Sequence, residues 1–401
     1  MRNSLRSLVA MAMVASTALG ANAQEEKKAE EGYTFTHTID IPTTSVKDQF
    51  RSGTCWSFST VSFLESEMMR LGKDSIDLSD MYAVAVCYRG KGERAVRLHT
   101  SCEFGAGGAA HDLLWVLKNY GMVPEEAYKG LNYGLSQHNH GELDRVAKGF
   151  INSLAGDPNT KSLTTAWKKA YAGILDAYLG ELPTEFTFNG KTYTPRTFAD
   201  QVVGLNPDDY VCLSSYTHHP FYGKFILEVP DNWLCGEVYN VPLEDLMRIT
   251  DNALKNGYSI AWGSDVSEKG FSYYNGVAVV PETNEDNLEG TELSRWQKLS
   301  KGDRQSYGLK SPVKEKTITQ EMRQEAFDNY ETTDDHGMHI VGMAKDQNGT
   351  EYYVVKNSWN VGNPYKGYLY VSKAFYAYKT MDIMIHKNAI PSDLKKKLGI
   401  K

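Results

Sequence analysis

The chain has 401 residues, which is enough for two or three domains with a large hydrophobic core. It carries 43 lysines and arginines against 50 aspartates and glutamates, a formal net charge of −7. This modestly acidic balance argues against a nucleic-acid partner, which would require a basic face.

The first 23 residues are typical of a secretory signal peptide. Arg2 and Arg6 give a positive start, residues 8–19 are apolar or small, and 21–23 form an A-x-A cleavage pattern. The alternative is a membrane anchor, but the apolar run is too short to span a bilayer and no cysteine sits at the cleavage site to carry a lipid. We therefore expect an exported protein, periplasmic or secreted, without stable membrane insertion.

Helices are predicted next along the chain. A short polar lead-in, 24–45, precedes a pattern over 55–71 in which apolar residues recur at spacings of three and four. A second helix is expected over 79–88, and a third over 109–119, closed by Gly121.

The middle of the chain is helical and polar. Two short stretches in it, 210–214 and 258–262, have strand character. The acid-rich stretch 283–333 is expected to form a loop and a surface helix. Helical patterning occupies 143–155, 161–179, 197–203 and 243–256.

The last third has the pattern of antiparallel strands. Residues 336–344 and 352–356 predict a hairpin with a tight turn at Asn348-Gly349, and further strands are expected at 368–372 and 381–386. Helices followed by strands indicate an α+β fold, in which a helical part faces a mainly antiparallel sheet.

Cys55 opens the first predicted helix, directly after a loop. A cysteine at a helix N-terminus feels the positive end of the helix dipole and unpaired N–H groups, which favour the thiolate. We therefore expect a lowered pKa and a nucleophilic sulfur. The alternative is a small buried hydrophobe at the start of a helix.

Gln49 lies six residues before Cys55, across a glycine-containing turn, so its side-chain NH₂ can return toward the cysteine. Together with the backbone N–H of Cys55 it would make a two-donor oxyanion hole. Trp56 follows Cys55 directly, and its side chain would border the start of the helix.

The predicted hairpin brings a histidine and an asparagine together. With a tight turn at 348–349, His336 and Asn357 come within a few residues of each other across the strand pair. The Asn357 carbonyl would then hold one ring nitrogen of His336 and turn the other toward the cysteine. Trp359 would shield that bond from water.

His339 competes with His336 for this role. The two lie three residues apart, so on a strand they face opposite sides and only one of them can face the cysteine. Periodicity does not choose between them. The alternative for His339 is an ordinary, partly buried strand histidine.

The segment from Gln49 to Ser59, QFRSGTCWSFS, resembles the nucleophile segment of papain-family cysteine peptidases. The resemblance implies that Cys55 is the nucleophile and Asn357 the orienting residue. The family order of histidine, small residue and apolar residue matches His336-Gly337-Met338, so His336 is assigned as the general base. It also implies no need for a metal or an organic cofactor.

Gly107 and Gly108 match the glycine pair that lines the cleft of papain-like enzymes, where the backbone binds an extended substrate. Glycine suits this position because the substrate main chain must approach closely. The alternative is a flexible loop before a helix.

The long separation of Cys55 from His336, about 280 residues, and the segments 107–113 and 260–266 resemble the bleomycin hydrolase and bacterial aminopeptidase C family. The resemblance implies an often hexameric enzyme that removes residues from peptide N-termini. It implies a papain-like domain over 24–401 after the signal peptide 1–23, with a helical part at about 46–124, a helical insert at about 125–250 and a β-rich part at about 257–401.

Two departures from that family stand out. The resemblance implies a C-terminal tail whose carboxylate holds the amino group of the substrate, whereas this sequence ends with the lysine-rich stretch 394–401. An open cleft would permit internal cleavage, so an endopeptidase is one alternative, and a non-catalytic peptide-binding protein is another. Asn360 also follows Trp359 where the family usually has glycine.

The remaining cysteines and histidines give weaker signals. Five cysteines leave at least one thiol unpaired within the chain, and the sequence does not show any pairing among Cys87, Cys102, Cys212 and Cys235. No cysteine spacing suggests zinc, and His218-His219 lacks spaced ligand partners, so no metal site is expected.

Overall fold

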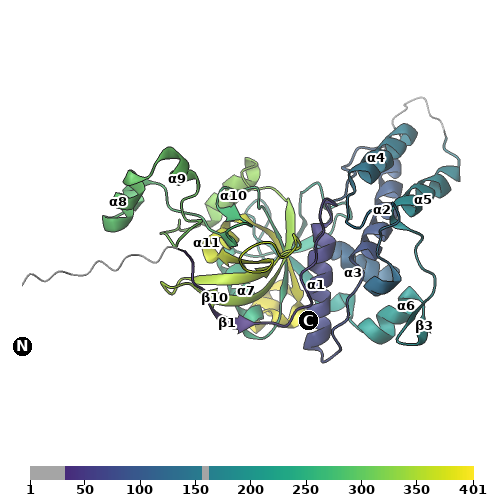
Figure 1. Cartoon of the computed structure of the whole chain (residues 1–401), viewed down its shortest axis with the longest axis horizontal. Helices are drawn as coiled ribbons and strands as arrows, with labels where there is room; N and C mark the ends of the chain where they lie inside the picture. Colours follow the sequence, from purple (N-terminus) through teal and green to yellow (C-terminus); the bar gives the residue numbers. More distant parts are fainter. Residues whose placement is uncertain (1–31, 156–161) are drawn as a thin grey trace, which may run out of the picture. The chain divides into compact units, whose positions relative to one another are not determined.

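Helix α1 (Cys55–Arg70) has no exposed face through most of its length, because every side chain from Trp56 to Met68 is buried. A helix buried all round lies inside the core of a protein. It contacts strand β10 (His336–Lys345) as well as helices α2 (Asp80–Arg97) and α3 (Ala110–Asn119). It therefore joins a helical part to a β-rich part (Figure 1).

The computed structural model describes residues 32–155 and 162–401, which belong to one unit. The expected signal peptide, 1–23, lies outside the described residues. Within the described ranges, no helix combines the length and the apolar character that a membrane crossing would need.

The helical part has its own hydrophobic core, which α1 shares. Phe63, Val84, Leu113, Ile151 and Leu175 come from five different helices and are all fully buried in one cluster. The other elements of this part are α4 (Gly141–Ala155), α5 (Ala166–Leu179), α6 (Pro195–Phe198), a π-helical turn η2 (Ala199–Val203), the 3₁₀ turns η1 (Glu125–Ala127) and η3 (Pro207–Asp209), and a hairpin of β2 (Phe186–Phe188) and β3 (Lys191–Tyr193).

Eleven strands of the described residues form a single sheet in the order β5-β6-β4-β13-β7-β10-β11-β12-β9-β8, with β1 beside β10. Two neighbouring pairs, β4–β6 and β12–β9, are parallel, and the rest of the sheet is antiparallel. The predicted α+β fold is therefore confirmed. The strands are β1 (Thr36–Asp40), β4 (Tyr210–Ser214), β5 (Lys224–Ile226), β6 (Glu237–Asn240), β7 (Ile260–Ser264), β8 (Phe271–Ser272), β9 (Val277–Ala278), β10, β11 (Glu351–Lys356), β12 (Tyr368–Ser372) and β13 (Thr380–His386).

A second hydrophobic core lies between the sheet and helices from the second half of the chain. Leu246 and Ile249 of α7, Phe375 of α11 and Leu394 of α12 pack in it with strand residues such as Ile340. The bounds are α7 (Leu243–Lys255), η4 (Glu285–Asn287), α8 (Gly290–Lys298), α9 (Lys301–Gln305), α10 (Gln320–Asp328), α11 (Lys373–Lys379), η5 (Lys387–Ala389) and α12 (Ser392–Leu398).

The prediction that the second helix ends near residue 88 is wrong, because α2 continues to Arg97. Gly90 and Gly92 suggest a break in sequence, but they serve packing between helices. A Cβ at Gly90 would lie 2.8 Å from the Trp233 ring, and one at Gly92 would overlap the ring of Tyr171.

The predicted hairpin turn is confirmed. Gly349 has a φ of +84°, in the left-handed region that glycine tolerates. The carboxylate of Asp346 accepts hydrogen bonds from the N–H groups of Asn348, at 2.8 Å, and Thr350, at 2.9 Å. The hairpin pairs His339 with Lys356, which brings the start of β10 beside the end of β11.

Candidate active site

Cys55 is the first residue of α1, and the start of β10 passes directly beside it. Close approach of the two backbones requires glycine at position 337. A Cβ there would lie 3.1 Å from the Cα of Trp56 and 2.8 Å from the hydroxyl of Ser59. His336, the residue before Gly337, is thereby held next to the nucleophile candidate.

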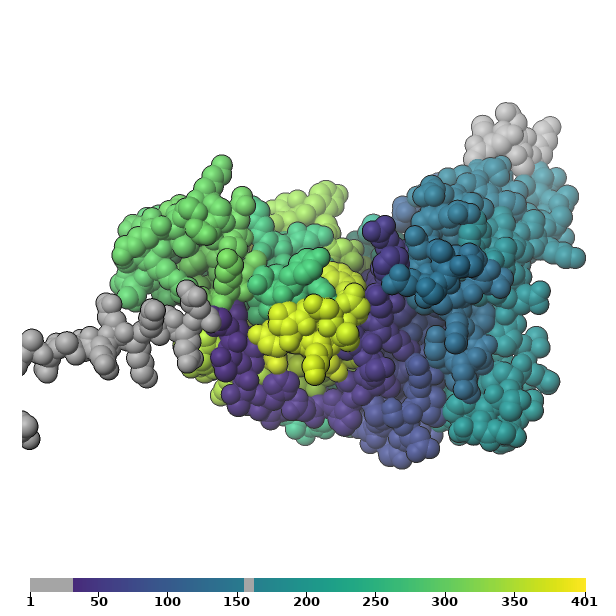
Figure 2. All heavy atoms as spheres, viewed as in Figure 1, coloured from purple at the N-terminus to yellow at the C-terminus, as the bar shows by residue number. Residues whose placement is uncertain are grey.

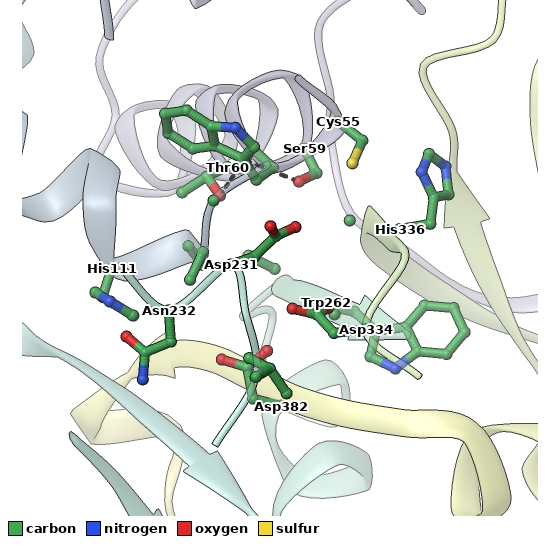
Figure 3. A pocket seen from close by; sticks show the side chains of 18 of the residues that line it. Cys55, Ser59, Thr60, His111, Asp231, Asn232, Trp262, Asp334, His336 and Asp382 are labelled. Carbon is green, nitrogen blue, oxygen red and sulfur yellow. Dashed lines mark hydrogen bonds between the residues drawn. The ribbon is translucent and has the colours of Figure 1, made fainter. Parts of the chain in front are cut away.

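His336 is only 4% exposed, and its Nε2 lies 2.8 Å from the Oδ1 of Asn357. The ring of Trp359 covers this pair, with its centroid 4.4 Å from that of the imidazole. Figure 3 shows Cys55 and the imidazole of His336 beside each other at one side of the pocket. The three predicted catalytic residues and the predicted aromatic shield therefore lie together.

His339 faces away from this pocket. Its side chain is fully buried, and its Nδ1 lies 2.9 Å from the hydroxyl of Ser62 in α1. Burial, followed by the charge of Lys356, holds the pKa of His339 well below its usual value. The tertiary contacts thus separate the two histidines that periodicity could not.

Gln49 is buried, and Ser358 determines the orientation of its amide. The hydroxyl of Ser358 donates to Oε1 of Gln49 at 2.6 Å, and the N–H of Gln49 donates to the Ser358 carbonyl at 2.9 Å. With its carbonyl oxygen engaged, the side-chain NH₂ of Gln49 is the group left to donate elsewhere. Ser358 was not identified from the sequence, although it adjoins Asn357.

The expected lowering of the Cys55 pKa is wrong for the free site. Burial raises the pKa of the thiol to about 12, and the negative charges of Asp334 and Asp231 add to the rise. Hydrogen bonds from the backbone N–H groups of Gly337 and Trp56 oppose it. Helix-end effects were foreseen, but the desolvation and the acidic surroundings depend on the tertiary structure.

Burial also lowers the pKa of His336 to about 4, against the opposing effects of Asn357 and Asp335. The surroundings therefore favour a neutral thiol beside a neutral imidazole. Transfer of the thiol proton to His336 produces opposite charges that stabilise each other, so the two groups titrate as a pair.

The glycine pair lies beside the start of α3. Gly108 lines the pocket that contains Cys55, and a Cβ at this position would lie 2.9 Å from the Trp56 indole. The indole donates from Nε1 to the Ala106 carbonyl at 3.0 Å. At Gly107 the space that a Cβ would fill is taken by the carboxylate of Asp231. A segment of the insert therefore lies over Gly107, which the sequence did not indicate.

The same pocket has an acidic lining. Besides Cys55 and His336, the pocket is lined by Asp231, Asp334 and Asp382 (Figure 3). These aspartates come from the insert, from the residues before β10 and from β13, so their approach depends on the fold. Asp334 precedes His336 by two residues, but no motif marked any of the three.

Asn360 has a left-handed conformation, with a φ of +62°. Asparagine tolerates this region better than other residues with a Cβ, which explains how it can stand where relatives usually have glycine. Its Oδ1 also accepts a hydrogen bond from the N–H of Gly362 at 2.7 Å.

The remaining candidates lie apart from the pocket. His218 and His219 do have a partner that the sequence did not reveal, because both Nε2 atoms lie within 3.1 Å of the carboxylate of Glu228. These three could hold a metal ion. Each histidine is already satisfied by one carboxylate oxygen, so the contacts need no ion. All five cysteines carry free thiols.

The C-terminal residues pack on the β-rich part. Leu394 and Leu398 of α12 are buried there, and Asp393 forms a two-pronged ion pair with Arg248 of α7 at 2.7 and 2.8 Å. Figure 2 shows the yellow end of the chain at the surface. None of the residues from 392 to 401 lines the pocket of Cys55.

Two family models match the chain. Residues 36–172 match the papain family of cysteine proteases, and residues 290–400 match the peptidase C1-like family. The two matches include Cys55 in the first and His336 with Asn357 in the second.

Known proteins match over nearly the whole chain. Aminopeptidase G of Lactobacillus delbrueckii is 23% identical, over 90% of this chain and 85% of its own. Aminopeptidase E of Lactobacillus helveticus is 23% identical over 99% and 93%, and human bleomycin hydrolase 21% identical over 90% and 84%. The crystal structure of PepW from Lactobacillus rhamnosis matches with a TM-score of 0.68 at 20% identity, covering 91% of this chain and 84% of that one, which supports the same fold.

Proposed function

Because this chain belongs to the papain-like cysteine peptidases, in the group of aminopeptidase C and bleomycin hydrolase, we propose that it removes residues from the N-termini of peptides. The observation that carries the catalytic part is the 2.8 Å contact between His336 and Asn357 in the pocket that also contains Cys55.

In the proposed reaction the Cys55 thiol gives its proton to His336, and the thiolate attacks the scissile carbonyl carbon. The negative oxygen that forms accepts hydrogen bonds from the Gln49 side-chain NH₂ and the Cys55 N–H. Collapse of this intermediate breaks the C–N bond, and His336 returns the proton to the leaving amine. Water, activated by His336, then hydrolyses the thioester and frees Cys55.

Asn357 supports this cycle by holding the ring of His336 through Nε2, which leaves Nδ1 for proton exchange with sulfur. Trp359 covers the contact and reduces the access of water to it. Asn357 and Trp359 thus keep the imidazole in position, and neither takes part in forming or breaking a bond.

The position of Asp231 supports exopeptidase over endopeptidase action. An internal cleavage site needs room for substrate residues on both sides of Cys55, and the glycine pair would bind the residues before the scissile bond. With a carboxylate over Gly107, that path is obstructed and polar. A free substrate N-terminus would end near this obstruction.

A direct test compares fluorogenic aminoacyl amides with a free amino group to the same compounds N-acetylated. We expect at least tenfold higher kcat/KM for the free amines, and no turnover by Cys55→Ala. Comparable cleavage of acetylated substrates would establish the endopeptidase alternative. Binding of peptides without any turnover would instead support the non-catalytic alternative.

Two further properties of the protein belong to this proposal. Export to the periplasm or medium is supported by the composition of the first 23 residues. Cell fractionation and N-terminal sequencing test it, with a mature terminus near residue 24 as the expected result. The family resemblance supports a homo-oligomer, often a hexamer, and light scattering of the purified protein would measure it.

A further inference from the structure

We propose that Asp231, Asp334 and Asp382 form an amine-binding subsite next to Cys55, which takes the positively charged ammonium group of a substrate. This inference rests on the proposed peptidase function and specifies which chemical group of the substrate the site would bind. The ammonium can be the α-amino group of a free N-terminus or the side chain of a basic residue.

The three aspartates converge from separate segments of the fold (Figure 3). Within the described residues, none of the three has a hydrogen-bond donor or an ion-pair partner at its carboxylate. The neighbouring Asp335 differs, because it accepts hydrogen bonds from the N–H groups of Val266, at 2.8 Å, and Ser267, at 3.2 Å. Asp335 is thus engaged in the protein itself, whereas the other three remain available.

Ordinary acidic surface clusters face bulk water, but these three aspartates are partly buried and line a pocket. Its cavity volume is about 40 Å³, whereas one water needs roughly 10–15 Å³. Ala261, Trp262 and Leu227 contribute apolar walls. The space suits an ammonium group with a few waters better than a large side chain, and low-polarity walls strengthen attraction between opposite charges.

Positive charge is scarce around this pocket. Among the described residues that line it there is no lysine or arginine, and the histidines are His111 and His336. Lys91 lies behind the glycine loop, where its Nζ contacts the carbonyls of Gly105, at 3.2 Å, and Gly107. Burial raises the pKa of Asp231 and Lys91 opposes this rise, so the protein offsets the negative charge of the pocket only in part, and a bound cation would add to that compensation.

Burial of these carboxylates in one pocket raises the pKa of Asp334 and of Asp382. Burial, together with Asp382, Asp231 and Asp335, raises the pKa of Asp334 well above its usual value. Burial also raises the pKa of Asp382 to about 6, opposed by His111. Carboxylates gathered without partners destabilise the empty pocket, so they gain from a cation that binds there.

His336, the general base of the proposed reaction, lines the same pocket as the three aspartates. Its side chain is almost fully buried, and its Nε2 is held by Asn357. Within the described residues no hydrogen bond involves its Nδ1, and the residue lines the pocket together with Cys55. A group bound by the aspartates would therefore lie beside the reacting atoms.

The subsite also has a predicted effect on the nucleophile. Asp334 and Asp231 disfavour the thiolate of Cys55, so a cation bound between them would reduce this opposition. A substrate with an ammonium group would bind and at the same time ease ionisation of the sulfur. A neutral substrate would neither bind to the aspartates in this way nor ease ionisation of the Cys55 thiol.

Asp334→Asn and Asp231→Asn test both effects at once. We expect kcat/KM for free-amine substrates to fall at least tenfold, while iodoacetamide alkylates Cys55 at lower pH than in the wild type. The variants should therefore be less active while their Cys55 thiol is more reactive at a given pH. A loss of both activity and thiol reactivity would indicate a merely damaged site and would overturn the proposal. The matched control is Asp208→Asn, which removes an exposed acid paired with Lys118 at 2.6 Å. We expect it to leave kcat/KM and the pH dependence of Cys55 alkylation unchanged.

A binding experiment on the wild-type protein avoids dependence on folding of the variants and on turnover. Leucinamide is expected to change the alkylation rate of Cys55 at concentrations where N-acetyl-leucinamide does not. Equal effects of the two compounds would overturn the amine subsite. If leucinamide binds but no peptide is cleaved, the peptidase proposal fails and the subsite stands.

Two substrate series identify the source of the ammonium. Selective turnover of unblocked peptides, whatever their side chains, assigns the α-amino group. Selective turnover of N-acetylated peptides with lysine before the residue at the scissile bond assigns the side chain. Equal rates for acetylated peptides with leucine and lysine at that position, together with no preference for free amines, would overturn the proposal.

Discussion

The hydroxyl of Ser358 donates a 2.6 Å hydrogen bond to the side-chain carbonyl of Gln49. Because the amide of glutamine has one acceptor and one donor end, this bond engages the acceptor end and leaves the NH₂ free to donate, as the proposed oxyanion hole requires. Ser358 also follows Asn357, whose Oδ1 accepts the Ser358 N–H at 2.8 Å. A single residue thereby connects the oxyanion donor with the residue that holds the imidazole.

Ser358→Ala is expected to lower kcat about tenfold with little change in KM, because the Gln49 amide loses its preferred orientation. Gln49→Ala removes the donor itself and should lower kcat by roughly 10²–10³-fold. Steady-state kinetics of both variants and of the double variant measure this. An additive loss in the double variant would contradict the link between them.

Asn357→Ala is expected to lower kcat on the order of 10²-fold, because the ring of His336 loses the partner that holds it for proton transfer. The fold should tolerate the change in thermal unfolding. Ser62→Ala, which removes the partner of the other buried histidine, is the control and should affect stability with kcat retained. Equal losses of kcat in the two variants would mean that His339 matters as much as His336.

Gly337→Ala should reduce both activity and stability, because the added methyl group meets the backbone of Trp56 at 3.1 Å. To relieve this contact, the start of α1 must move away from β10, and Cys55 then moves away from His336. We expect a cost of about 1–3 kcal/mol in unfolding free energy. Gly149→Ala is the control, since its added Cβ meets nothing within 4 Å, and it should be neutral or stabilising.

Acid should destabilise the protein through its buried histidines. Burial lowers the pKa of His140 to about 4, with a further contribution from His138, whereas an unfolded histidine titrates near pH 6.5. Between these values the unfolded state binds the proton and the folded state does not. The free energy of unfolding therefore falls as pH drops from about 6.5 to 4, by up to roughly 1.4 kcal/mol per pH unit for this residue.

Urea titrations between pH 7 and 4.5 measure this dependence. His140→Gln removes the titrating group, so its free energy of unfolding should fall less steeply with pH than that of the wild type. Identical slopes would show that His140 is protonated in the folded state.

Much of the catalytic arrangement was predictable because it depends on local patterns. Cys55 opens an apolar helix after a glycine-containing turn, and this position follows from residue spacing alone. The pairing of His336 with Asn357 follows from a two-strand hairpin whose turn, at Asn348-Gly349, is itself a local signal. Short-range chemistry and strand geometry are sufficient for such features.

Other features were beyond the sequence because they depend on contacts between distant segments. The length of α2 was misjudged because its glycines are explained by Trp233 and Tyr171, residues from elsewhere in the chain. The carboxylate that satisfies His218 and His219 was likewise missed. In each case the contacting residue could not be found from the periodic spacing of residues along the sequence.

The sequence by itself predicted Cys55 at the start of a helix, a histidine brought near Asn357 by a hairpin, and the α+β order of elements. Only the tertiary structure decided which histidine faces the sulfur, how the Gln49 amide is turned, and that Asp231, Asp334 and Asp382 meet in one pocket. The physical reason is that helix starts and hairpins arise from neighbouring residues. Desolvation and the repulsion among buried charges depend on every segment that encloses them.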